Sequence, residues 1–144
     1  MDTIIGLAFG KGKINRFLAE RIKEIAETDP QNQVIVQDDI YEAGKDILFP
    51  VKIISKIGGY LDTIEVLKQV KAFMGISGGD KAMIVCHRLH YKRAIKIAQK
   101  IGLKVMRLDL TETPLDRNDP QKHCRNWLIY KLWEIPAWIK YWLE

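Results

Sequence analysis

The sequence predicts an α/β fold with a three-layer, Rossmann-like architecture: a mainly parallel sheet of four to five strands with helices on both faces. Short apolar runs of strand length occur at residues 3–9, 33–37, 81–86 and 103–110. Segments with the spacing of an amphipathic helix separate these runs. Strands that alternate with helices form parallel sheets, because each helix carries the chain back to the same end of the sheet.

The first half of the chain contains two such strands. The strand at 3–9 ends in a glycine turn at 10–12, and a helix closed by Pro30 follows it. Proline biases the residue before it away from the helical conformation, which explains that boundary. After the strand at 33–37, residues 41–59 lack a clear period. We interpret them as a long connection with room for one short helix.

The second half repeats the alternation. Asp62 and Glu65 form a capping-box-like start for a helix that continues to Gly75. Three further elements follow in order: a strand at 81–86, a helix at 90–100 and a strand at 103–110. A polar loop at 111–120 leads into a helical remainder. We expect this remainder to be broken at Pro136, which suits the first turn of a final short helix.

Length and composition indicate one globular domain, 1–144, with an aromatic-rich helical segment at 122–144. The net charge of +5 is mild and dispersed, so we expect no nucleic-acid partner. The two cysteines, Cys86 and Cys124, indicate no disulfide framework. The chain shows no signal peptide and no apolar run of about 20 residues that could span a membrane. We therefore expect a cytoplasmic protein without a transmembrane segment.

The turn after the strand at 81–86 carries an unusual concentration of basic groups. A helix start here holds His87, Arg88, His90, Lys92 and Arg93. The first turn of a helix carries a partial positive charge, which favours acidic side chains. Basic groups are useful there if an anion binds the unpaired N–H groups of the helix start. We therefore expect a small anionic ligand, phosphorylated or nucleotide-like, with Arg88 and Arg93 among its contacts.

Polar or glycine residues follow other strands as well. Gly10 and Lys11 follow the first strand, and Asp38 follows the second. The carboxyl ends of parallel strands meet at one edge of the sheet, where ligands of such folds bind. We expect these three residues to join the ligand site, with a role in the turn as the alternative for Asp38.

Residues 85–94 resemble a motif of the YdcF-like bacterial family, a group whose common reaction is not settled. In that motif a strand is followed by a His and, three residues later, by an Arg, here His90 and Arg93. The family's Thr and Glu at an upstream helix start match Thr63 and Glu65. The resemblance implies a Rossmann-like fold with a polar site at the strand ends, formed by these four residues.

The chain also departs from that family. Cys86 and His87 stand where the family has a Thr-Ser pair, and residues 37–39 replace a glycine-rich strand end. The resemblance therefore predicts the fold more closely than it predicts the ligand.

If the site is catalytic, His90 or His87 would act as general acid or base in ester or phosphate-ester chemistry, with Glu65 orienting the ring. Such a site places Thr63 or Glu65 about 3 Å from one of the histidines. The alternatives are structural. His90 can pack at the helix start, Arg93 can lie on the surface over apolar side chains, and Glu65 can complete a capping box.

Two other chemistries are less favoured. Cys86 ends a buried strand, where cysteine usually serves as a small hydrophobic residue rather than a nucleophile. A metal site would have to use His87, His90 and an aspartate at 38 or 39, and the neighbouring arginines would repel a cation. We predict no metal site. No G-x-G-x-x-G fingerprint occurs, so a dinucleotide is not indicated and the cofactor is unknown.

All four tryptophans lie in the segment 126–143. This helix either covers the edge of the sheet or forms a contact surface. Three charged residues, Lys131, Glu134 and Lys140, interrupt its apolar residues. We therefore expect the helix to lie against a surface rather than to span a membrane. Because the polar face of this helix is not rich in basic residues, we expect homo-oligomers rather than lipid contact.

Two functions remain open. In the first, the protein binds a small anionic ligand, with hydrolase or transferase chemistry on it as one form. In the second, it is a non-catalytic partner-binding protein that works through its exposed aromatic C-terminal helix.

Overall fold

The computed structural model describes residues 2–48, 52–54, 62–78 and 81–143, and it confirms the α/β fold with a five-stranded, fully parallel sheet. The strand order is β3-β2-β1-β4-β5. The strands are β1 (Thr3–Gly6), β2 (Gln33–Gln37), β3 (Lys52–Ile54), β4 (Ala82–His87) and β5 (Val105–Thr111). The helices are α1 (Ile14–Glu27), α2 (Asp38–Gly44), α3 (Thr63–Ser77), α4 (Tyr91–Lys100) and α5 (Trp127–Leu143), with a 3₁₀ turn, η1, at Lys122–Cys124.

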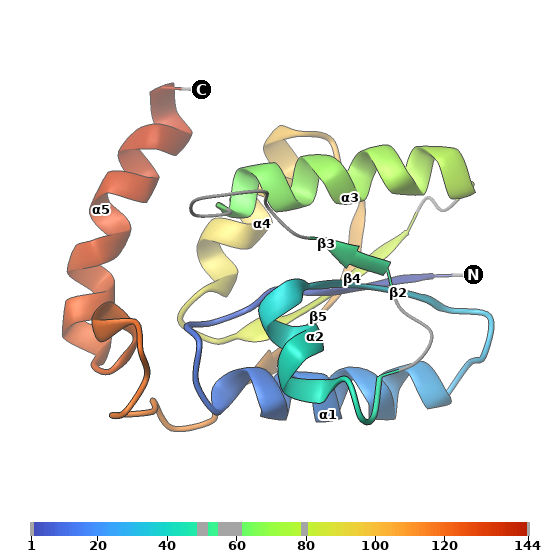
Figure 1. Ribbon diagram of the computed structural model, residues 1–144. Coiled ribbons are helices and arrows are strands. Elements are labelled where there is room, and N and C mark those ends of the chain that lie inside the picture. Colours follow the sequence, from blue (N-terminus) through green and yellow to red (C-terminus); the bar gives the residue numbers. More distant parts are fainter. Residues whose placement is uncertain (1, 49–51, 55–61, 79–80, 144) are drawn as a thin grey trace.

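Helices cover both faces of the sheet (Figure 1). One core joins α3 and α4 to strand residues such as Ile5, Ile84 and Cys86, and the other joins α1 and α2 to Ile4 and Val85. Neighbouring strand residues therefore point into different cores. A strand buried on both faces needs apolar side chains at every position, which explains why these strands are continuous apolar runs.

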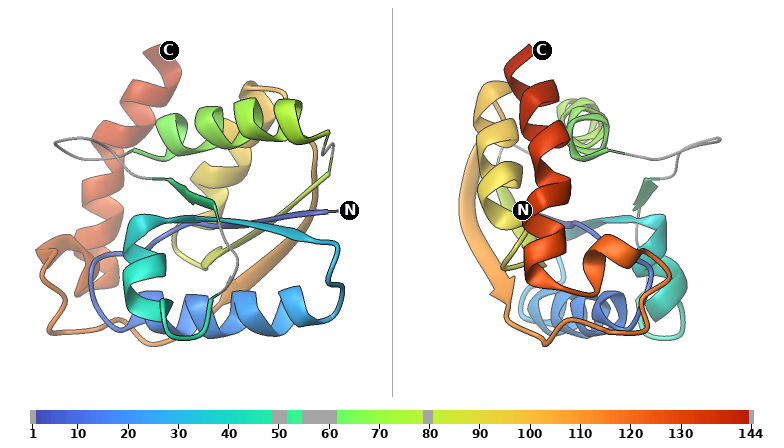
Figure 2. Two further views of the ribbon diagram at one scale, coloured as in Figure 1. Left: turned by 45° about the vertical axis from the view of Figure 1, so that its right-hand side comes forward. Right: turned by 90° about the vertical axis from the view of Figure 1, so that its left-hand side faces the viewer.

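The order of the strands determines where a site can form. From β1 the chain moves outward to β2 and β3, and then returns past β1 to β4 and β5. Ligands of open parallel sheets bind at the carboxyl ends of the strands, beside this reversal. Helix α5 stands across that end of the sheet, as Figures 1 and 2 show from different sides. It therefore lies where a ligand site is expected.

The connection predicted at 41–59 contains most of the short helix for which the sequence left room, but this helix begins earlier, and a strand that was not predicted follows it. Helix α2 begins at Asp38, directly after β2, so Asp38 and Asp39 form a first helical turn rather than a loop. Strand β3 follows at Lys52–Ile54, and the remainder at 49–51 and 55–59 lies outside the described residues. A seven-residue helix and a three-residue strand are too short to produce a recognisable period.

The predicted break at Pro136 is also wrong. Helix α5 continues through this residue to Leu143. A proline has a helical φ angle but removes one N–H, whose partner here would be the carbonyl of Leu132. Leu132 is exposed, so water can replace the missing donor without interrupting the helix.

Candidate functional site

A cavity of about 360 Å³ lies between the start of α3, one side of α4 and the inner side of α5. It brings together three residues that the sequence predicted for one site: Thr63, Glu65 and Arg93. Its other lining residues are Asp62, Ile64, Ile97, Trp133, Pro136, Ala137 and Lys140. The cavity lining therefore combines charged and hydroxyl groups with apolar side chains.

His90 does not line this cavity, but it is hydrogen-bonded to Thr63, which does. Its Nε2 and the Thr63 Oγ1 are 2.9 Å apart, and both side chains are buried. The predicted contact of about 3 Å between Thr63 or Glu65 and one of the histidines is thus present. Burial, with Arg93 and His87 nearby, lowers the pKa of His90 from 6.5 to about 3. The ring is therefore neutral at physiological pH.

Arg93 is a buried ion-pair partner, not the surface residue that one interpretation of the sequence suggested. Its Nε donates to Glu134 Oε1 of α5 at 3.2 Å, and the two side chains are only 9% and 7% exposed. Tyr130 lies in the same buried environment, and burial beside Glu134 raises its pKa well above 10. The pair consequently fixes α5 against α4 and places Arg93 at the cavity wall.

The start of α3 forms the other polar wall. Asp62 is the N-cap, and its Oδ1 accepts the Glu65 N–H at 2.9 Å. Lys140 reaches across from α5 and forms an ion pair with the Asp62 carboxylate. Burial acts to raise the pKa of Asp62, but the bonds from Lys140 and the Glu65 N–H outweigh it and lower that pKa. Asp62 therefore has the capping role that the sequence allowed.

His87 is held away from this cavity by bonds at both ring nitrogens. Its Nε2 donates to the Thr113 carbonyl at 2.8 Å, and its Nδ1 accepts the Leu89 N–H at 3.2 Å. The ring also packs against Phe9, with 4.5 Å between centroids. These bonds fix the Nε2–H tautomer, and burial lowers the pKa of the ring. In this geometry His87 supports the turn between β4 and α4.

The glycine turn after β1 binds an internal carboxylate. Asp119, which is fully buried, accepts the N–H of Lys11 at 3.1 Å and that of Gly12 at 3.0 Å. Gly10 has φ of +65°, and a Cβ on it would lie 2.1 Å from the Asp119 Oδ2. The turn that was predicted to receive a ligand at Gly10 and Lys11 thus receives a carboxylate of the chain itself.

The remaining predicted residues are also apart from the cavity. Asp38 sits in the first turn of α2, where its Oδ1 accepts the Asp39 N–H. Arg88 is exposed and pairs with Glu112 at 3.3 Å. The basic residues around the start of α4 therefore separate, and among them only Arg93 lines the cavity.

Sequence reasoning missed the contribution of α5. Its residues Trp133, Pro136, Ala137 and Lys140 line the cavity, and Glu134 lies behind it. Their spacing of three, four and seven residues is that of one helix side, so a helical plot could have grouped them. No such signal marked Asp119, which lies in a polar loop.

Other chemistry at this end of the sheet is restricted by burial. Burial raises the pKa of the Cys86 thiol to about 12, and the same cause acts on Cys124. Among the described residues, no three His, Cys, Asp or Glu side chains gather closely enough to hold a metal ion. No helix within the described ranges is long and apolar enough to cross a membrane.

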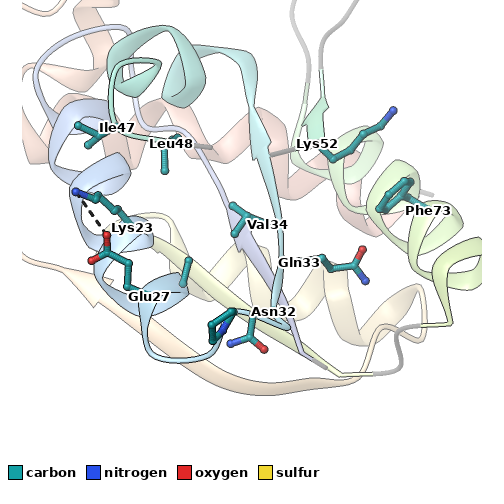
Figure 3. A pocket seen from close by; sticks show the side chains of 11 residues that line it. Lys23, Glu27, Asn32, Gln33, Val34, Ile47, Leu48, Lys52 and Phe73 are labelled. Carbon is teal, nitrogen blue, oxygen red and sulfur yellow. Dashed lines mark ion pairs between the residues drawn. The ribbon is translucent and has the colours of Figure 1, made fainter. Parts of the chain in front are cut away.

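A second cavity, of about 730 Å³, lies at the opposite edge, near the amino ends of β2 and β3 (Figure 3). Its walls include Val34, Leu48 and Phe73, and the ion pair between Lys23 and Glu27 lies at its rim. It contains none of the residues predicted for the ligand site.

Comparisons with known proteins add little to this geometry. No protein-family model matches the chain, and no curated protein matches it in sequence. Among solved structures, the glycotransferase of kitacinnamycin superposes with a TM-score of 0.40 at 10% identity, over 96% of this chain and 39% of that one. The chain thus spans well under half of that protein, and so distant a likeness says nothing about function.

Proposed function

We propose that this protein binds a small anionic molecule with an apolar or aromatic part, such as a nucleotide, in the cavity between α3, α4 and α5. The observation that carries this proposal is the mixed lining of the cavity, which combines cationic and hydroxyl groups with apolar side chains. The lining includes the cations of Arg93 and Lys140 and the Thr63 hydroxyl, and it also includes the apolar side chains of Ile97 and Trp133. Ligand sites commonly combine a mostly apolar lining with a few polar groups that fix orientation.

The charges of the lining residues support an anionic group on the ligand. Arg93 and Lys140 are cationic, and the amino end of the 15-residue helix α3 adds a partial positive charge. Each cation already contacts a carboxylate, of Glu134 and Asp62 respectively. A ligand phosphate would therefore share these cations, as charge-assisted networks allow. The volume lies at the lower end of the usual range, roughly 300–1,000 Å³, which favours a small ligand.

Binding is better supported than catalysis. A hydrolase or transferase would use the Thr63 hydroxyl with His90 as its base, and Glu65 would help to orient the ligand. An efficient general base has a pKa near the working pH, whereas burial lowers that of His90 to about 3. Because the His90 ring stays neutral at physiological pH, it is better suited to a fixed hydrogen bond with Thr63 than to proton transfer.

The test is a thermal-shift and calorimetry series with adenosine monophosphate, ribose 5-phosphate, inorganic phosphate and uncharged adenosine. We expect the nucleotide to raise the melting temperature most, since it can contact both the polar and the apolar residues of the lining. Lys140→Gln should weaken that binding, whereas Lys131→Gln, on the same helix but away from the cavity, should not. No shift with any phosphorylated compound, or equal shifts with adenosine and its monophosphate, would overturn the proposal.

A second candidate function is contact with a partner through α5. Nine large apolar side chains of this helix are about half exposed or more: Trp127, Leu128, Ile129, Leu132, Trp133, Ile135, Ile139, Trp142 and Leu143. An apolar surface of this extent on one element usually marks an interaction site.

A further inference from the structure

The outer side of α5 carries a regular apolar seam that the fold does not use. We define this seam as the five residues Leu128, Leu132, Ile135, Ile139 and Trp142. Their exposed fractions range from 53% to 77%. The steps between them are four, three, four and three residues, which is the repeat of a coiled-coil helix. Residues so spaced form one narrow stripe along a helix.

The seam and the attachment of α5 lie on different sides of the helix. Tyr130 and Glu134 are the buried residues of α5, and they face the body of the protein together with Ala137, which lines the cavity. At about 100° per residue, these positions are on the side of the helix away from the seam. In Figures 1 and 2 no described element covers that outer side. The seam is therefore available to a second helix.

We propose that the seam pairs with the α5 seam of a second copy of this chain, in an antiparallel helix pair with Ile135 at the two-fold axis. In this arrangement Leu128 faces the partner's Trp142, and Leu132 faces the partner's Ile139. An antiparallel pair also places opposite ends of the two helix dipoles side by side. This gives the second candidate function, contact through α5, a defined partner.

The exposed area fits a second copy. A stable interface needs roughly 800 Å² from each partner, and an aromatic side chain such as Trp142 buries about 150–250 Å² when fully covered. The seam residues are about half exposed or more, and so are Trp127, Ile129 and Leu143 on the same helix. The combined exposed area of these side chains is of the order of the area that such an interface buries. A two-fold pair uses the same surface on both copies, so one sequence pattern satisfies both.

A lipid surface fits the same helix less well. Helices that lie on membranes carry many Lys and Arg on their polar side, and α5 has only Lys131 and Lys140. Lys140, moreover, pairs with Asp62.

The test measures the mass of the full chain in solution by sedimentation velocity over a range from about 1 to 200 µM. We expect a dimer. Leu132→Lys and Ile139→Glu should each weaken dimerisation by about 100-fold or more, because each buries a charge in an apolar seam. Ile76→Glu is the control, since Ile76 is 87% exposed but lies on α3, and this variant should dimerise like the parent.

Mixing the two seam variants tests the orientation. In the antiparallel pair the lysine introduced into one chain would face the glutamate introduced into the other. A mixture of Leu132→Lys and Ile139→Glu chains should therefore form a heterodimer, although neither variant dimerises alone. In a parallel pair the two charges do not meet, and no rescue is expected. A parent chain that stays monomeric throughout overturns the proposal, and flotation of that monomer with phosphatidylcholine–phosphatidylglycerol vesicles would assign the seam to lipid.

Failure here is distinguishable from failure of the ligand proposal. None of the five seam residues lines the cavity, so the monomeric variants can be tested with the same nucleotide. Ligand binding that survives in a monomer supports the first proposal whatever the outcome for the seam.

Discussion

The Oγ1 of Thr63 and the Nε2 of His90 lie 2.9 Å apart and connect the starts of two helices that are 27 residues apart in sequence. The bond forms at the carboxyl end of the sheet, where α3 and α4 converge on the cavity. Because both side chains are buried, water cannot replace either partner. A second proton on the imidazole is unfavourable at this position, since the charged ring would be desolvated there.

The stability of the protein should consequently fall in mild acid. Between pH 6.5 and about 3 the unfolded chain protonates this histidine and the folded chain does not. The free energy of unfolding then rises with pH in that window and is lost as the pH falls through it, by at most about 1.4 kcal/mol per pH unit for one histidine. The pKa of His87 is lowered in the same direction. Urea denaturation at intervals from about pH 7.5 to about pH 5 measures this slope.

His90→Gln is the control for that slope. The variant should be less stable at about pH 7 but should lose stability less steeply as the pH falls from about 6.5 to about 5. The carboxyl groups with lowered pKa, such as those of Asp62 and Asp109, add to the loss only below about pH 4. An unchanged slope in His90→Gln would show that His90 is not the group responsible.

Two Arg–Glu pairs near the start of α4 have nearly the same N–O distance but differ in burial. Comparing them shows how burial changes the contribution of an ion pair to stability. Arg93 and Glu134 lie 3.2 Å apart and are buried, whereas Arg88 and Glu112 lie 3.3 Å apart and are exposed. Arg93→Met should lower the free energy of unfolding by about 3–5 kcal/mol, because it leaves Glu134 buried without its cation. Arg88→Met should cost at most about 1 kcal/mol. Equal effects in urea denaturation would contradict the buried position of the first pair.

The two thiols should be unreactive in the folded protein. Burial raises the pKa of both Cys86 and Cys124 to about 12, so about one thiol in 10,000 is ionised at pH 8. We expect no rapid reaction with Ellman's reagent until a denaturant is added, and then reaction of both. Ile76→Cys, which places a thiol at an exposed position, should react at once. Rapid labelling of Cys86 in the folded parent would instead support its role as a nucleophile.

Much of the fold could be predicted because its main strands are continuous apolar runs between amphipathic helices. Strand β3 was missed because it is short. The short helix for which the sequence left room begins before residue 41, because Asp38 at its start is typical of a turn as well as of a first helical turn. The predicted helix break at Pro136 was wrong for another reason, because an exposed helix tolerates the loss of one hydrogen bond.

The site was predictable only in part. The resemblance to a known motif grouped Thr63, Glu65, His90 and Arg93, and these residues do converge on one cavity or its wall. Glu134 is 41 residues from Arg93, and no spacing rule predicts such a contact. The loop at Gly10 shows the same limit, because the carboxylate that occupies it comes from a residue more than 100 positions further along the chain.

Gly10 and Gly78 provide a matched pair for measuring how much the contact between Asp119 and the turn at Gly10 contributes to stability. Both have positive φ, +65° and +78°, but a Cβ on Gly78 meets nothing within 4 Å, whereas one on Gly10 collides with the Asp119 carboxylate. Gly78→Ala should cost about 1–2 kcal/mol for the left-handed backbone alone. Gly10→Ala should cost about 3 kcal/mol or more, because it also displaces a carboxylate that accepts two N–H groups of the loop. Urea denaturation of both variants checks this, and equal losses would mean that Asp119 contributes little to the turn.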